Sequence, residues 1–239
     1  MFMKICGLQK TTLLDFPGRV AATVFLGGCG LRCPFCHNSD LISMDAPALM
    51  EPEQLLSFLK KRRSVLDGVC ITGGEPTLFP EDLERLLDSI KSLGLLTKLD
   101  TNGFRPDVLR RLCAAGLIDY AAMDIKAGRS NYPSACGVPS LSIEPAEESA
   151  RLLMEGSVDY EFRTTAVKGI HSLSDFVDIR SWIGGCRRYF LQNFQDSGRV
   201  AQPGFQPFLP SELKTFLDAV RETIPQAQIR GTDLDPRDF

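Results

Sequence analysis

The stretch V-A-A-T-V-F-L-G-G-C-G-L-R-C-P-F-C-H-N, residues 20–38, decides the fold. It opens with a run of apolar and β-branched residues at 20–26, which is typical of a strand inside a parallel sheet. Three cysteines, Cys29, Cys33 and Cys36, follow this run directly. We therefore predict that three thiols gather at the carboxyl end of the first strand, where an α/β barrel holds its reactive groups.

Outward from this strand, the chain alternates short apolar runs with amphipathic stretches bounded by Pro, Ser or Gly. The apolar runs predict strands at 20–26, 68–72, 95–100, 120–125, 160–165 and 189–194, with a short final strand at 226–230. The amphipathic stretches predict helices at 52–63, 81–93, 106–115, 145–154, 174–183 and 211–224. Six βα units predict a partial (β/α)6 TIM-like barrel, with a doubly wound sheet as the alternative.

The composition is that of an ordinary globular protein: 239 residues, of which 44% are hydrophobic and 24% charged. We expect a single domain over 1–239, with a core at about 18–195 and a C-terminal extension at about 196–239. The net charge of -3 gives no global positive field, so nucleic acid is not an expected partner. The basic run at 60–63 is interpreted as the solvated end of the helix predicted at 52–63.

The sequence has no apolar run long enough to cross a bilayer, and its start does not resemble a signal peptide. We therefore expect a cytoplasmic protein that does not act at a membrane. In a reducing compartment, eight cysteines predict metal binding or packing rather than disulfides. Cys70 and Cys113 lie in apolar patterns and are expected to pack, while Cys6, Cys136 and Cys186 have no partner at ligand spacing.

Three thiolates on one short loop can bind an iron-sulfur cluster or zinc. A fourth cysteine is missing nearby, which favours a cluster with one iron open to a substrate. The alternative is a zinc site that uses His37 or a distant thiol as its fourth ligand, as in a non-enzymatic zinc-binding interaction module. Packing of all three cysteines in a core is disfavoured, because Gly30, Arg32 and Pro34 do not suit a hydrophobic strand.

The spacing Cys-x3-Cys-x2-Cys, with an aromatic residue before the last cysteine, resembles the signature of the radical S-adenosylmethionine (SAM) enzymes. The resemblance implies that Cys29, Cys33 and Cys36 hold a [4Fe-4S] cluster and that SAM chelates its fourth iron. It further implies that an electron from the cluster cleaves SAM to methionine and a 5'-deoxyadenosyl radical, which abstracts hydrogen. Phe35 and His37, within the same motif, are expected near the cofactors.

Later strand ends resemble the same family. Gly73, Gly74 and Glu75 resemble its Gly-Gly-Glu motif, whose backbone and carboxylate bind the SAM ammonium. By resemblance to activating enzymes of glycyl-radical proteins, Asp100 and Asp124 would hold a monovalent cation beside the SAM carboxylate. The other SAM-binding residues implied by this resemblance are Thr101, Asn102, Lys126, Arg163 and Gln192. For these residues a surface salt bridge or a strand-end cap is the open alternative.

In two segments the sequence resembles one particular family of activating proteins. These segments are K-T-T-L-L-D-F-P-G at 10–18 and F-L-G-G-C through C-H-N at 25–38. Both segments resemble the activating proteins of anaerobic ribonucleoside-triphosphate reductase. That family implies a radical SAM oxidoreductase whose partners are this glycyl-radical enzyme and a low-potential electron donor such as flavodoxin or ferredoxin. The alternative target is pyruvate formate-lyase or another glycyl-radical enzyme.

Overall fold

The computed structural model describes residues 2–196 and 198–231. Its strands follow one another in chain order across one sheet that begins at β1 and ends at β8. This strand order is that of an open sheet, as expected for a partial barrel. The strands are β1 (Ile5–Thr12), β2 (Ala21–Leu26), β3 (Gly68–Gly73), β4 (Leu96–Thr101), β5 (Tyr120–Asp124), β6 (Asp159–Ala166), β7 (Tyr189–Asn193) and β8 (Gln228–Arg230).

Helices alternate with these strands, which confirms the predicted α/β class. Proline occupies the start of α1, α2, α3 and α7, where its missing N–H costs no intrahelical bond. The α-helices are α1 (Pro52–Arg62), α2 (Pro80–Ser92), α3 (Pro106–Ala114), α4 (Tyr132–Ala135), α5 (Glu144–Glu155), α6 (Leu173–Trp182) and α7 (Pro210–Arg221). Two single-turn 3-10 helices are η1 (Ser39–Leu41) and η2 (Pro76–Leu78).

The chain divides into two compact units, and the boundary runs through the cysteine motif. Unit 1 contains the chain up to Gly30, Asp40–Ala122 and Gly156–Asp159. Unit 2 contains Leu31–Ser39, Met123–Glu155 and the chain from Tyr160 onward. The single domain expected from the sequence stays a prediction, and residues 197 and 232–239 of the expected extension lie outside the described residues.

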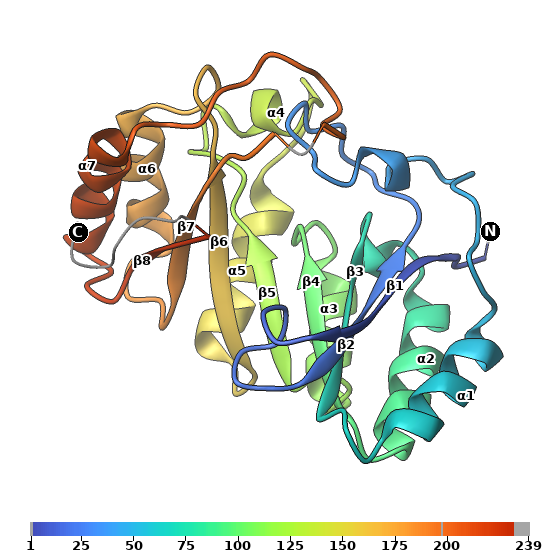
Figure 1. The fold of residues 1–239 in the computed structure, drawn as a ribbon. Coiled ribbons are helices and arrows are strands. Elements are labelled where there is room, and N and C mark those ends of the chain that lie inside the picture. The colour runs from blue at the N-terminus through green and yellow to red at the C-terminus, as the bar shows by residue number, and fades with distance from the viewer. Residues whose placement is uncertain (1, 197, 232–239) are drawn as a thin grey trace. The chain divides into compact units, whose positions relative to one another are not determined.

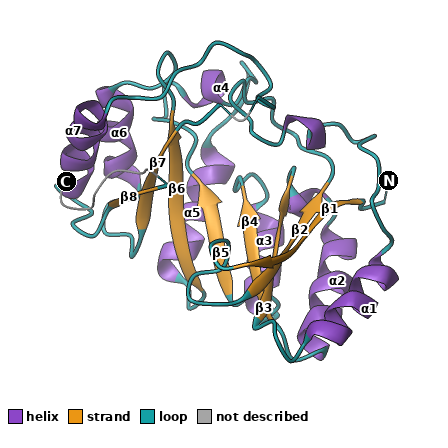
Figure 2. Cartoon of the chain, in the orientation of Figure 1, coloured by secondary structure: helices purple, strands orange, loops and turns teal. Residues whose placement is uncertain are grey.

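In unit 1, β2, β3 and β4 are parallel and in register, so that Leu26 of β2 lies beside Gly73 of β3. This register brings Cys29, which follows β2, and the Gly-Gly-Glu segment after β3 to the same edge of the sheet. β1, which the sequence analysis did not predict, pairs antiparallel with β2. Figures 1 and 2 show α1 beside α2, and α2 packs against β4.

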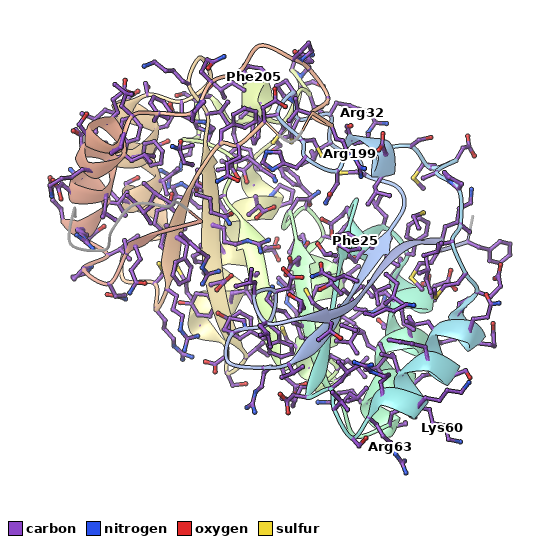
Figure 3. The ribbon with its side chains drawn as sticks, in the orientation of Figure 1. Phe25, Arg32, Lys60, Arg63, Arg199 and Phe205 are labelled. Atoms are coloured by element: carbon purple, nitrogen blue, oxygen red, sulfur yellow. The ribbon has the colours of Figure 1, made fainter. Side chains whose placement is uncertain are left out.

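The basic run lies in and just after the last turn of α1, as predicted. Figure 3 shows Lys60 and Arg63 extending outward from this end of the helix. Cations at a helix carboxyl end complement its dipole and are well solvated. No helix in the described part of the chain is long and apolar enough to cross a membrane.

In unit 2, β6, β7 and β8 are parallel, and Ala166 of β6 lies beside Asn193 of β7. α6 and α7 lie side by side, as Figure 1 shows in orange and red. The buried rings of Phe176 and Phe216 stack between these two helices, with centroids 4.5 Å apart. Burial of large aromatic rings is a major source of core stability, so this contact fixes α6 and α7 on each other.

Candidate active site

The end of β3 is built so that only glycine fits. Gly74 donates its amide to the Leu26 carbonyl at 2.8 Å, and Glu75 donates to the Gly28 carbonyl at 2.7 Å. A Cβ atom would lie 2.3 Å from the Leu26 oxygen at Gly73, where φ is +121°, and 2.1 Å from the Gly28 oxygen at Gly74. The two glycines therefore let the backbone after β3 approach the residue before Cys29 closely.

Glu75 is 2% exposed, and its carboxylate accepts several hydrogen bonds. Oε1 accepts from the Thr77 amide at 3.1 Å and from the Thr101 hydroxyl at 2.8 Å. Oε2 accepts from the Asn102 amide at 2.7 Å. Burial raises the pKa of Glu75, while these donors favour its charged form. Glu75 therefore ties the ends of β3 and β4 together, a role that the sequence analysis did not foresee.

Cys29 lies beside the end of β4 in unit 1. The Asn102 side-chain amide donates to the Cys29 sulfur at 3.9 Å, and the Cys29 amide donates to the Ile42 carbonyl at 3.1 Å. Thr101 accepts the Gly103 amide at its hydroxyl, at 3.1 Å. The structure thus brings Cys29, Thr101 and Asn102, three of the predicted site residues, to one place around Glu75.

Asp100, predicted to help hold a monovalent cation, already has a basic partner. The ammonium of Lys98, which is 1% exposed, pairs with its carboxylate. The thiol of Cys70 donates to the same carboxylate at 3.6 Å, so this buried cysteine packs against the ion pair rather than holding a cluster. The Lys98 charge balances the Asp100 charge, and the cation stays a prediction.

Cys33 and Cys36 form a turn in unit 2, in which the Cys36 amide donates to the Cys33 carbonyl at 3.1 Å. A hydrogen bond from the Cys136 thiol lowers the pKa of Cys33 to about 7, against the effect of burial. Burial raises the pKa of Cys36, and the Lys126 charge opposes this rise. Cys33 therefore ionises more readily than an ordinary thiol, and the thiolate is the form that binds iron.

The partner of Cys33 was missed from the sequence. Cys136 is fully buried at the end of α4, and its carbonyl accepts the Arg32 amide at 2.9 Å. The next residue, Gly137, has φ at +64° and packs tightly against Arg32. A Cβ atom at Gly137 would lie 2.1 Å from the Arg32 carbonyl oxygen. No spacing rule links Cys33 to Cys136; the glycine after Cys136 was the one local signal of a tight approach.

Asp124, Lys126 and Arg163 form one charged cluster at the ends of β5 and β6. The Asp124 carboxylate accepts from the Lys126 ammonium at 2.9 Å and from the Arg163 Nε at 3.1 Å. Burial alone would raise the pKa of Asp124, but the two cations lower it to about 2. Asp124 in turn raises the pKa of Lys126 well above its usual value, against burial. All three groups are therefore charged at neutral pH, with one net positive charge.

The two rings of the cysteine motif lie against other aromatic rings. Phe35 meets His171 edge-on, with centroids 5.8 Å apart, and His37 stacks on Phe194 at 5.5 Å. Among the described residues, no three His, Cys, Asp or Glu side chains converge on one metal ion. Gln192 lies half-buried on β7, beside Arg230 of β8.

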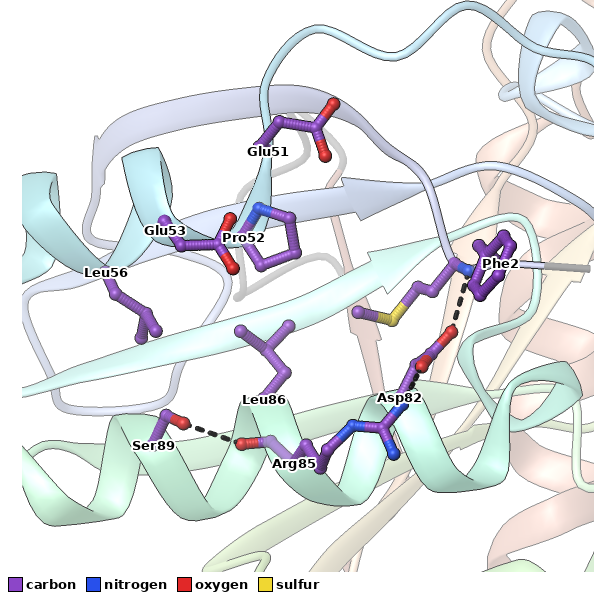
Figure 4. Close-up of a pocket in the computed structure, with 10 residues that line it drawn as sticks. Phe2, Glu51, Pro52, Glu53, Leu56, Asp82, Arg85, Leu86 and Ser89 are labelled. Carbon is purple, nitrogen blue, oxygen red and sulfur yellow. Dashed lines mark hydrogen bonds and ion pairs between the residues drawn. The ribbon is translucent and has the colours of Figure 1, made fainter.

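A separate pocket of about 470 Å³ lies in unit 1, close to the start of the chain (Figure 4). Apolar side chains from the N-terminal segment and from α1 and α2 form part of its lining, and Asp82 and Arg85 pair at its edge. It contains none of the predicted site residues. The complete lining is Phe2, Met3, Glu51, Pro52, Glu53, Leu56, Asp82, Arg85, Leu86 and Ser89.

The family of this chain follows from its match to a protein-family model. Residues 23–183 match the model of the radical SAM superfamily. The chain belongs to this superfamily. The match begins inside β2 and contains the cysteine motif, the end of β3 and the ends of β4 to β6. The residues around Glu75 and the cluster of Asp124, Lys126 and Arg163 therefore lie within it.

Relatives whose names give more than one activity are similar to this chain. A Methanocaldococcus jannaschii protein bearing the name of a glycyl-radical enzyme activating enzyme is 29% identical over 197 residues, 80% of each chain. Clostridium pasteurianum pyruvate formate-lyase-activating enzyme is 37% identical over 105 residues, 42% of this chain and 44% of the relative. Hyperthermus butylicus 7-carboxy-7-deazaguanine synthase is 40% identical over 91 residues, 38% of each chain.

A solved structure also resembles this chain in its fold. Streptococcus suis SuiB bound to S-adenosylmethionine superposes with a TM-score of 0.67 at 17% identity. The match covers 86% of this chain and 48% of SuiB, so the chain spans about half the length of that protein. At this identity the likeness shows a shared fold, and it confirms the partial barrel expected from the sequence.

Membership of the superfamily implies a [4Fe-4S] cluster and SAM, and the residues fit both groups. The Cys33 thiol has a lowered pKa and the Cys29 sulfur accepts a hydrogen bond from Asn102, and both features favour thiolate ligands. The net positive cluster of Asp124, Lys126 and Arg163 suits an anionic group such as a carboxylate.

Proposed function

We propose that this chain is the activating enzyme of a glycyl-radical enzyme, and that its target is anaerobic ribonucleoside-triphosphate reductase. One observation carries the activase assignment: the M. jannaschii relative with such a name matches along 80% of both chains, whereas the matched synthase of H. butylicus covers 38%. The reductase as target is supported by the two sequence segments at 10–18 and 25–38.

In this proposal, Cys29, Cys33 and Cys36 hold the cluster through their thiolates. When bound, the cluster and SAM supply one-electron chemistry that yields methionine and a 5'-deoxyadenosyl radical. Lys126 and Arg163 offer their charges to the SAM carboxylate, and Asp124 keeps both cations oriented. A low-potential flavodoxin or ferredoxin would donate the electron.

The Gly-Gly-Glu segment has a different part. The close approach of Gly73 and Gly74 to the end of β2 fixes the backbone that carries Glu75. The Glu75 Oε2 accepts from the Asn102 amide, and because a carboxylate oxygen has two lone pairs, it retains capacity to accept from the SAM ammonium.

Two other activities are the competing candidates. The pyruvate formate-lyase-activating enzyme of C. pasteurianum is more similar per residue, at 37%, but over less than half of each chain. The same holds for the 7-carboxy-7-deazaguanine synthase of H. butylicus, whose activity is not that of an activase by name. Because one fold hosts many chemistries, the assay must separate a protein target from a small one.

The test is an EPR experiment with the reduced, reconstituted protein, SAM and a candidate partner. With anaerobic ribonucleoside-triphosphate reductase we expect one glycine-centred radical, together with methionine and 5'-deoxyadenosine. Deuteration of the glycine Cα in the partner should collapse the main hyperfine doublet and place deuterium in the deoxyadenosine. A signal with pyruvate formate-lyase alone would transfer the proposal to that target, and SAM cleavage that requires a small molecule would end the activase assignment.

Two cysteine variants serve as matched controls. Cys33→Ser should lose the cluster, because a hydroxyl is a poor substitute for a thiolate on iron. Cys70→Ser makes the same chemical change at a buried thiol that packs against Asp100. It should keep the iron and sulfide content of the parent protein, and an equal loss in both variants would show that the ligand assignment is wrong.

A further inference from the structure

His171, a buried residue after β6, is held in one tautomer. It is 6% exposed, and its Nδ1 accepts the Val167 amide at 3.0 Å. The His171 amide donates back to the Val167 carbonyl at 2.9 Å, which closes a tight turn. Because Nδ1 accepts a hydrogen bond, it carries no proton, and the proton of the neutral ring is on Nε2. Burial lowers the pKa of His171, which favours this neutral ring.

The Nε2 proton is directed at the turn that follows β5. Nε2 lies 2.7 Å from the carbonyl oxygen of Lys126 and donates to it. The residue before Lys126 is fixed independently: the Ile125 amide donates to the Arg163 carbonyl at 2.7 Å, and the Thr164 hydroxyl donates to the Ile125 carbonyl at 2.8 Å. His171 thus completes the set of bonds that hold this backbone turn.

The backbone at Lys126 decides where its ammonium lies. That ammonium pairs with Asp124 at 2.9 Å, and Asp124 also binds Arg163, so the three charges hold one another at fixed positions. A small change in the backbone would move the ammonium relative to its two neighbours. Displacements of about 1 Å in a binding group are enough to weaken a site considerably.

The same ring touches the cysteine motif. Phe35, between Cys33 and Cys36, meets the His171 ring edge-on at 5.8 Å, with an interplanar angle of 69°. On another side, Phe176 of α6 lies 6.2 Å away. His171 is therefore shared by the segment that carries two of the thiols and by the turn that carries Lys126.

We propose that His171 is a positioning residue that sets the SAM-binding geometry of Lys126 through the Nε2 to Lys126 carbonyl hydrogen bond. The inference rests on the proposed binding of SAM by this chain. An ordinary core histidine would be satisfied by the same contacts, so the test must separate the bond to Lys126 from the packing of the ring.

Two amide variants make this separation. In His171→Gln the side-chain NH2 can take the place of Nε2 and donate to Lys126, while the bond from Val167 is lost. In His171→Asn the amide oxygen can take the place of Nδ1 and accept from Val167, but the shorter side chain does not reach Lys126. Both variants lose the ring contacts with Phe35 and Phe176, so packing is matched between them.

The measurement is the SAM dissociation constant of the reconstituted protein, by equilibrium dialysis, together with KM and kcat for deoxyadenosine formation. We expect His171→Asn to raise the dissociation constant and KM about tenfold with little change in kcat, the loss typical of one hydrogen bond to a group that then lies buried and unpaired. His171→Gln should remain within about twofold of the parent protein. Equal weakening in both variants, or none in either, overturns the proposal.

A double-mutant cycle gives a second, independent decision. If His171 acts through Lys126, the effect of His171→Asn must disappear in a Lys126→Met background, because the ammonium that it positions is absent. If the losses of His171→Asn and Lys126→Met add up in the double variant, the proposal is overturned. The cycle can also be run with His171→Gln, and additive losses there count against the proposal in the same way. A parent protein that holds its cluster but does not bind SAM would instead refute the proposed function, so the two failures are distinguishable.

Discussion

At the scale of single residues, Glu75 shows how a structural and a binding role can coincide. The resemblance predicted a contact with the SAM ammonium, which stays a prediction. The structure adds that the buried carboxylate accepts bonds from Thr77, Thr101 and Asn102. Removing it leaves several buried donors without an acceptor, which costs stability whether or not SAM is bound.

We therefore expect Glu75→Ala to lower the free energy of unfolding of the cluster-free protein by about 1–3 kcal/mol, the cost of leaving buried donors unpaired. Glu75→Gln is the matched control, because its amide oxygen can still accept at one position. Urea unfolding without cofactors measures the stability of both variants. If Glu75→Ala unfolds at the same urea concentration as the parent, the tie between β3 and β4 is energetically unimportant.

Asp124 should make the protein sensitive to acid in a definite window. Its pKa of about 2 in the folded chain lies below the ordinary carboxyl value, so the folded state favours the charged form. This contribution is fully present above about pH 4 and is lost as the pH falls towards about 2. It amounts to about 2 kcal/mol.

Asp124→Asn should remove that part of the acid dependence. The variant is less stable than the parent at neutral pH, since Lys126 and Arg163 lose their partner. Between about pH 5 and about pH 2, however, its free energy of unfolding should fall by about 2 kcal/mol less than that of the parent. Denaturant unfolding at several pH values measures both slopes, and parallel slopes would contradict the assigned ion pairs.

At the scale of elements, the sequence predicts most strands and helices because each has a clear period and a proline or glycine boundary. β1 was not predicted, since its residues Ile5–Thr12 alternate poorly and it lies at an edge of the sheet. α4 is a helix of one turn, too short to show a period. The contact of His171 with Lys126 carries no local pattern, and the contact of Cys33 with Cys136 is signalled only by the glycine after Cys136.

The junction of β2 and β3 supports a prediction about glycine. Gly74→Ala would place a methyl group 2.1 Å from the Gly28 oxygen, so one of the two segments must move. We expect a loss of stability of about 2 kcal/mol or more, as for other forced overlaps with the backbone. Thermal unfolding of the cluster-free protein is the measurement.

Gly30→Ala makes the same substitution in the loop after β2 and is the control for Gly74→Ala. A Cβ atom at Gly30 meets no heavy atom within 4 Å. The variant should therefore unfold within about 0.5 kcal/mol of the parent, as expected for an uncrowded surface change. If the two variants were equally stable, the close approach after β3 would not constrain the chain.

At the scale of the whole molecule, the fold narrows the chemistry but does not choose the substrate. Relatives named as activating enzymes and as 7-carboxy-7-deazaguanine synthases both match this chain. In the proposed function, the strand ends of this chain with their thiols and charges serve SAM. Recognition of the final target depends on surfaces that carry no motif, and for this reason the sequence identified the cofactors more closely than the partner.

Paired complementation tests the whole chain in a setting where each target is present. We expect the gene to restore anaerobic growth to a strain that lacks the activating protein of anaerobic ribonucleoside-triphosphate reductase. In a strain that lacks 7-carboxy-7-deazaguanine synthase, it should restore no product. Cys33→Ser is the negative control in both strains, because in the proposed function the loss of this thiolate removes the cluster and with it the radical chemistry. Rescue of the second strain alone would show that the long match to activating enzymes reflects a common scaffold and that the true substrate is small.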